Sequence, residues 1–83
     1  MSYANDAPLS PQAVDRAIAL LRGGHSCRTK WRLWSCTPDG RFWSTQWAAK
    51  DNEWVGGFVT EEQMRAEIAE HSAAFRDLLA AAL

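Results

Sequence analysis

Four residues carry side chains that could bind zinc or pair as a thiol nucleophile with its base: His25, Cys27, Cys36 and His71. Structural zinc sites use closely spaced pairs such as Cys-x-x-Cys, and the spacing here matches no such site. If both cysteines lie on one strand, alternation also directs Cys27 and Cys36 to opposite faces of the sheet. We therefore expect two reduced thiols, with no disulfide, no metal ion and no other cofactor.

Other catalytic patterns do not occur in the sequence. The chain has no phosphate-binding loop, no dinucleotide fingerprint and no His-Glu-x-x-His segment. Its carboxylates gather toward the C-terminus, where Glu62 and Glu70, together with Arg65, have the spacing of solvated charges on a helix. The sequence therefore predicts a protein that is not an enzyme.

A stripe of basic and polar residues is the surface that could bind a partner. Its members alternate along one predicted strand and the next, so that they share a sheet face: Arg28, Lys30, Arg32, Trp34, Gln46 and Lys50. Cations beside an aromatic anchor can contact phosphates or an acidic protein surface. Alternation also produces the solvated face of an ordinary antiparallel sheet, so a purely structural role for this basic stripe stays open.

The first of two turns sets the register of the strands that carry the stripe. The segment Thr37-Pro38-Asp39-Gly40 has the residues of a type I turn followed by a glycine bulge. It pairs Thr37 with Arg41, and walking outward then sets Leu33 opposite Thr45. We expect strands at about 26–36 and 41–50 to form this hairpin.

The second turn, Asp51-Asn52, favours a two-residue hairpin that pairs Lys50 with Glu53 and begins a third strand at about 53–59. Both turns place one apolar set on the face opposite the basic stripe: Trp31, Leu33, Trp43, Trp47, Trp54 and Phe58. The sequence therefore predicts a three-stranded antiparallel meander with a tryptophan-rich face.

Two helices flank the predicted sheet. Ser10 at the N-cap and a proline after it begin a helix over 10–22, which ends at Gly23-Gly24. The capping box Thr60-Glu61-Glu62-Gln63 begins a second helix over 61–82, which either breaks near Ser72 or overhangs the sheet. We expect a flexible stretch over 1–9 and one α+β domain over 10–83. The predicted order is α-β-β-β-α, with both helices packed on the tryptophan-rich face.

The end of the second predicted helix is apolar on more than one side. Four residues there could form a dimer contact: Phe75, Leu78, Leu79 and Leu83. The alternative is that this segment packs on the first helix. The sequence leaves a monomer and a homodimer both open.

Composition and charge narrow the class of partner. Eighty-three residues make one small domain, and a net charge of −1 argues against a strongly basic nucleic-acid binder. The start of the chain has no basic, apolar signal sequence, and no run is long enough to span a membrane. We expect a cytoplasmic protein that does not enter a membrane.

Two families share features with this chain. The order helix, three strands, helix is similar to the double-stranded-RNA-binding domain, although that family has a lysine-rich start to its last helix where this chain has Thr60-Glu61-Glu62-Gln63. The stretch from Lys30 to Glu67, with Gly57-Phe58-Val59-Thr60 leading into a helix, resembles the arm-DNA-binding domains of phage integrases. That resemblance implies an open sheet face that enters the major groove of DNA.

These observations favour a small non-enzymatic protein that acts by protein–protein interaction. Phages and other mobile elements encode inhibitors of this kind, anti-CRISPR proteins among them, and we take such an inhibitor or regulator as the first hypothesis. The alternative is a DNA- or RNA-binding regulator that uses Arg28, Lys30 and Arg32.

Overall fold

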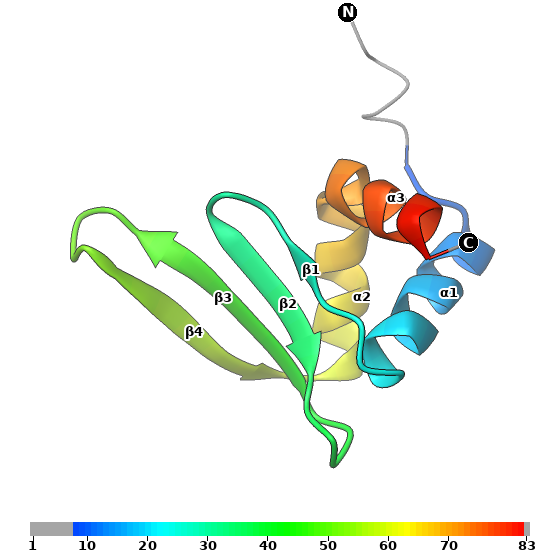
Figure 1. Ribbon diagram of the computed structural model, residues 1–83, viewed down its shortest axis with the longest axis horizontal. Coiled ribbons are helices and arrows are strands. Elements are labelled where there is room, and N and C mark those ends of the chain that lie inside the picture. Colours follow the sequence, from blue (N-terminus) through cyan, green and yellow to red (C-terminus); the bar gives the residue numbers. More distant parts are fainter. Residues whose placement is uncertain (1–7, 83) are drawn as a thin grey trace, which may run out of the picture.

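The computed structural model describes residues 8–82 and has two layers, with three helices on one face of a four-stranded antiparallel sheet (Figure 1). The helices and strands follow in the order α1 Pro11–Arg22, β1 Cys27–Arg28, β2 Arg32–Cys36, β3 Phe42–Ala48, β4 Glu53–Val59, α2 Glu61–Glu70 and α3 Ser72–Ala81. The strands lie side by side in chain order. The predicted α+β class and the helix–strand order are confirmed. The flexible stretch predicted for 1–9 falls largely outside the described residues.

The first predicted strand is in fact two strands, because the chain reverses at Thr29. The hydroxyl oxygen of Thr29 accepts hydrogen bonds from the backbone N–H groups of Trp31 and Arg32, at 3.2 and 3.1 Å. This turn pairs Cys27 with Trp34, so the two cysteines share a sheet face and the prediction of opposite faces was wrong. Both thiols are free.

The register predicted from the first hairpin turn is confirmed, and the register of the second is shifted. The backbone N–H of Thr37 donates to the carbonyl of Arg41 at 2.8 Å, and Leu33 pairs with Thr45. In the second hairpin Ala48, not Lys50, pairs with Glu53. Because the shift is two residues, every side chain of β4 keeps its predicted face.

The helix ends form as their sequences predict. Ser10 accepts a hydrogen bond from the backbone N–H of Ala13, and Gly24 adopts a φ of 100° just beyond the end of α1. Thr60 and Gln63 complete the reciprocal capping box at the start of α2. These local interactions fix where each helix leaves the sheet.

The last predicted helix breaks at His71, which leaves α2 and α3 as separate helices. α3 packs against α1 and β1. Phe75 is fully buried in the core, and Leu78 and Leu79 pack against that core. This is the alternative in which the segment covers the first helix, so Phe75 cannot serve as a dimer contact, and Leu83 lies outside the described residues.

The helices cover the opposite sheet face from the one predicted. Trp34 is fully buried and Phe42 is 3% exposed, and both pack with a set of buried helix residues: Ala17, Ile18, Leu21, Met64, Ile68 and Phe75. Trp31 and Trp54, by contrast, are 54% and 44% exposed. The expectation that both helices pack on the tryptophan-rich face was therefore wrong.

The helices gather over one side of the sheet, and the tip of the β3–β4 hairpin projects beyond them (Figure 1). β4 forms one edge of the sheet and pairs with β3 alone, and β1 forms the other edge. Among the helices of residues 8–82, none combines the length and the apolar character that crossing a membrane requires.

Candidate functional site

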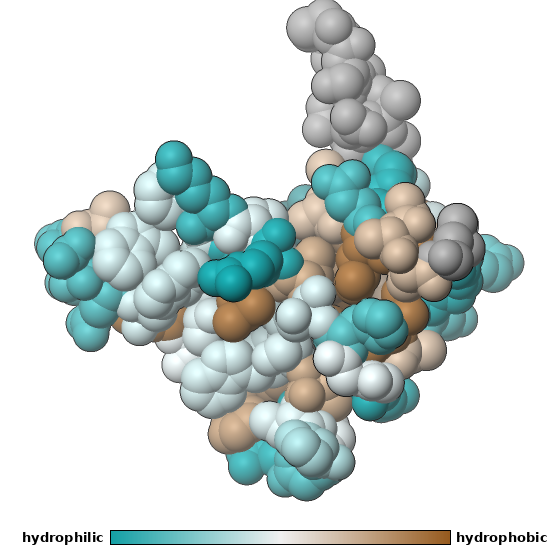
Figure 2. Space-filling view, in the orientation of Figure 1, coloured by the Kyte–Doolittle hydropathy of each residue, from teal (hydrophilic) through white to brown (hydrophobic). Residues whose placement is uncertain are grey.

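The sheet face turned away from the helices carries exposed aromatic side chains, and we call it the open face. Strand pairing and alternation give its residues: Arg28, Trp31, Leu33, Ser35, Trp43, Thr45, Trp47, Trp54, Gly56 and Phe58. Figure 2 shows a largely pale surface over β2, β3 and β4, which reflects the intermediate hydropathy of tryptophan, threonine and glycine.

The aromatic side chains of the open face are held in pairs across β3 and β4. The rings of Trp43 and Phe58 meet edge to face with their centroids 4.9 Å apart, and those of Trp47 and Trp54 do so at 5.7 Å. Directly opposed residues on antiparallel strands bring such rings together. The pairs form two aromatic ridges on a face that remains open to solvent.

Cations accompany these aromatic rings. The ammonium of Lys30 lies 5.1 Å from the ring centre of Trp31, and the guanidinium carbon of Arg41 lies 3.5 Å from that of Phe58. Arg28 pairs with Leu33 and so projects from the same face. The charged side chains of this face are therefore cationic.

The carboxylates of the sheet region lie elsewhere. Asp39 and Asp51 belong to the hairpin connections, and Glu53 pairs with Ala48 on the positions that alternate toward the helix side. Within strands β1 to β4 as described, no carboxylate falls on an open-face position. The open face thus combines apolar rings with one sign of charge.

A shallow trough of about 370 Å³ crosses the open face between the two ridges. Its lining residues come from all four strands: Arg28, Leu33, Trp43, Thr45, Trp54 and Gly56. Leu33, Thr45 and Gly56 are cross-strand neighbours and form its floor. The trough exists because these three positions carry small or medium side chains between rows of aromatic rings.

On the covered face, Glu67 of α2 accepts hydrogen bonds from polar groups that would otherwise be buried without partners. Its Oε1 atom accepts hydrogen bonds from Trp34 Nε1 at 2.9 Å, from the hydroxyl of Ser44 at 2.6 Å and from Arg32 at 2.9 Å. Arg32 also donates to Gln46 Oε1 at 2.6 Å. This network explains how an arginine and an indole of the predicted basic stripe come to lie under a helix.

The structure therefore divides the predicted basic stripe among different environments. Trp34 is buried in the core, and Arg32 and Gln46 take part in the network around Glu67. Gln46 is exposed, and so are three cations of the stripe: Arg28 on the open face, Lys30 in the turn before β2, and Lys50 in the β3–β4 connection. The stripe is not one surface, and the sequence interpretation missed that Arg28 and Lys30 belong with the aromatic face.

The environment of Glu67 also sets its acidity. Burial is the largest influence and raises the pKa of Glu67, but hydrogen bonds from Ser44 and Trp34 and the charge of Arg32 together bring the pKa below its ordinary value. A carboxylate whose pKa is lower in the folded than in the unfolded state stabilises the fold at neutral pH.

This shift predicts an acid-dependent loss of stability. The contribution of Glu67 is complete above the unfolded-state pKa of about 4.3 and is lost as the pH falls through the lower folded-state value. Urea unfolding between about pH 6 and pH 2.5 checks this expectation. Glu67→Gln should make the free energy of unfolding depend less steeply on pH below about 4.3, and an unchanged slope would contradict it.

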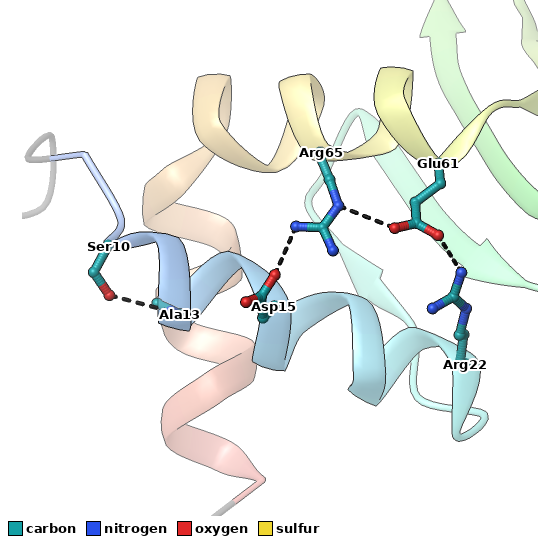
Figure 3. A network of polar contacts seen from close by, with 6 residues as sticks. All are labelled: Ser10, Ala13, Asp15, Arg22, Glu61 and Arg65. Atoms are coloured by element: carbon teal, nitrogen blue, oxygen red, sulfur yellow. Dashed lines mark hydrogen bonds and ion pairs between the residues drawn. The ribbon is translucent and has the colours of Figure 1, made fainter.

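Charged residues of the helix layer are engaged with one another (Figure 3). Arg65 of α2 donates to Asp15 of α1 at 2.7 Å and to Glu61 at 3.1 Å, and Glu61 also pairs with Arg22 at the end of α1. Hydrogen bonds from Arg65 and Arg22 lower the pKa of Glu61. These residues join two helices, so we assign them a structural role.

Two findings concern the residues that were considered for metal and thiol chemistry. Over residues 8–82, no three side chains of His, Cys, Asp or Glu come together as a metal site. Burial, with a smaller contribution from the charge of Asp77, raises the pKa of Cys27 to about 11. The thiolate form that a nucleophile requires is therefore disfavoured at neutral pH.

The two family resemblances concern topology, and the open face differs from what they imply. An integrase-like arrangement would place cations on the open face, and Arg28, Lys30 and Arg41 do lie there, but among five large aromatic side chains. Comparisons with protein-family models, with curated proteins and with solved structures found no match for this chain.

Proposed function

We propose that this protein acts by binding another protein through the open face. The observation that carries the proposal is the exposure of Trp31, Trp54 and Phe58, at 54%, 44% and 46%, on one continuous surface. Tryptophan and arginine are the residues most enriched among those that supply protein–protein binding energy. Large clustered apolar side chains on a surface are also typical of an interaction site.

The charge of the open face indicates the charge expected on the partner's surface. Arg28, Lys30 and Arg41 surround the rings, whereas the carboxylates of the described chain lie on the helices, in the hairpin connections and on the covered face of the sheet. Opposite charges around an apolar centre favour encounter and exclude wrong partners. We therefore expect a partner surface with an apolar centre and an acidic rim.

Single-stranded nucleic acid is the second candidate, favoured by aromatic rings and cations together on an antiparallel sheet. Base stacking requires free ring faces. Here the cations of Lys30 and Arg41 lie over Trp31 and Phe58, and the paired rings of β3 and β4 meet edge to face. The net charge of −1 gives little general attraction for phosphate, so a protein partner is the better hypothesis.

The binding proposal is tested with a double variant of the open face. We expect Trp31→Ser with Trp54→Ser to weaken binding to a captured partner by about 1,000-fold, because two exposed anchors are lost at about 2 kcal/mol each. Quantitative affinity capture followed by calorimetry measures the effect. Both residues are exposed, so the double variant should remain folded.

The matched control changes Gln12 and Arg16 to serine on the exposed side of α1. An equal loss of partner binding in the open-face variant and in this control would contradict the proposal. Fluorescence anisotropy with labelled oligothymidylate, from low to physiological salt, tests the second candidate. Salt-sensitive binding that depends on Trp31 and Trp54 would establish single-stranded nucleic acid as the ligand instead. The narrower hypothesis of a phage or mobile-element inhibitor depends on the identity of the partner.

A further inference from the structure

We infer that the trough on the open face binds an extended, proline-containing peptide segment with an acidic residue beside its prolines. The inference rests on the proposed function and names the part of the partner that the open face recognises. It follows from three properties of the trough: its direction across the strands, its aromatic walls and the single cation at its end.

The trough runs across the strands instead of along them. One wall contains Trp43 and the other contains Trp54, and Leu33, Thr45 and Gly56 form the floor between them. Trp54 and Phe58 belong to different ridges and lie four residues apart on β4, so the ridges are separated by about 13 Å along the strand. This width accommodates one extended chain between the ridges.

A peptide in this direction cannot extend the sheet. The backbone groups of a strand point sideways toward its neighbours, so the floor of the trough offers no ladder of hydrogen-bonding partners. A polyproline helix has no internal hydrogen bonds, keeps its backbone solvated and loses little conformational freedom on binding. Such segments characteristically dock in aromatic-lined grooves, which is the chemistry that the walls here provide.

The single charged residue that lines the trough is a cation, so we expect the ligand to carry a negative charge. Arg28 lies at the end of the row formed by Leu33, Thr45 and Gly56, on β1. No hydrogen bond, ion pair or ring contact engages its guanidinium within residues 8–82. A carboxylate on the bound segment would pair with Arg28 as the prolines pack between the tryptophans.

The test follows the indole N–H signals of the isotope-labelled protein by NMR during titration with short acetylated and amidated peptides. The probes are a proline-rich peptide with glutamates, the same peptide with lysines in place of the glutamates, and a glycine–serine peptide with the same glutamates. We expect the first probe to shift the signals of Trp43 and Trp54 while the signal of buried Trp34 stays in place. It should bind roughly fivefold more tightly than the lysine peptide.

Arg28→Glu supplies the decisive variant, because the residue is exposed and the fold should not depend on it. It should reverse the preference between the glutamate and lysine peptides. Equal binding of the glycine–serine peptide, an unchanged preference in Arg28→Glu, or the same indole shifts with oligothymidylate in place of peptide would overturn the inference. Absence of binding by every peptide would also overturn it, whereas the proposed function stands or falls separately on the loss of partner binding in the Trp31 and Trp54 double variant.

Discussion

Gly56→Ala is expected to destabilise the protein by about 3 kcal/mol, because an added methyl group has no room in the β3–β4 hairpin. A Cβ atom at this position would lie 2.1 Å from the carbonyl oxygen of Ser44 and 2.7 Å from the Cα of Thr45. Both are backbone atoms, so relief requires the strands to separate. Gly56 also has a φ of 152°, which side chains rarely allow.

The adjacent glycine provides the control. A Cβ atom at Gly57 would meet nothing within 4 Å, and we expect Gly57→Ala to leave the free energy of unfolding nearly unchanged or slightly raised. Thermal and urea unfolding of both variants measure the difference. Expressed as a melting temperature, Gly56→Ala should lose roughly 12–24 °C. Equal stability of the two variants would show that the hairpin does not have the described register.

Glu67→Ala is expected to cost about 3 kcal/mol, the second large effect. The substitution leaves Arg32, the indole N–H of Trp34 and the hydroxyl of Ser44 without their common acceptor under α2. Arg32 and Glu67 have side chains only 24% and 21% exposed, so water replaces the lost partner poorly. Urea unfolding at neutral pH measures the effect.

Two further variants separate the network from the general effect of removing a helical carboxylate. Glu70→Ala, at an exposed position of the same helix, should change the free energy of unfolding by less than about 0.5 kcal/mol. Glu67→Gln keeps an acceptor oxygen but loses the charge, so its cost should fall to roughly 1 kcal/mol. If Glu67→Ala lowers the free energy of unfolding no more than Glu70→Ala does, the result would contradict the described network.

The features that the sequence predicted correctly are those that depend on a few neighbouring residues. The turn at Thr37-Pro38-Asp39-Gly40 and the capping box at Thr60 form from contacts within four residues, and each sets an element boundary. The turn at Thr29 was missed because it contains no glycine, proline or asparagine. Its hydroxyl, bonded to Trp31 and Arg32, is the signal that could have revealed it.

The choice of sheet face depends on contacts between distant residues, and the sequence interpretation erred there. Counting tryptophans favoured the wrong face, because burial of Trp34 and Arg32 depends on a carboxylate from another element. The signal was Glu67, which lies between Met64 and Ile68 in the apolar stripe of α2. A carboxylate in a buried stripe requires a cation opposite it, and Arg32 is the inward-facing cation of β2.

The sequence predicted the candidate site only in part, because the site also depends on which sheet face the helices cover. The aromatic residues were correctly placed together on one face, since alternation and two turns sufficed for that. Their exposure could not be predicted, because it follows from which face the helices cover. The grouping of Arg28 with those rings also depended on the unrecognised reversal at Thr29.

The most direct test of the account is the solvent accessibility of the five indole groups, measured by NMR as line broadening from a neutral, soluble nitroxide. We predict the strongest broadening for Trp31 and Trp54, intermediate broadening for Trp43 and Trp47, and the least for Trp34, which is buried and bonded to Glu67. Strong broadening of Trp34 with protection of the other four would contradict the account. The helices would then cover the aromatic face, and no open surface would remain for a partner.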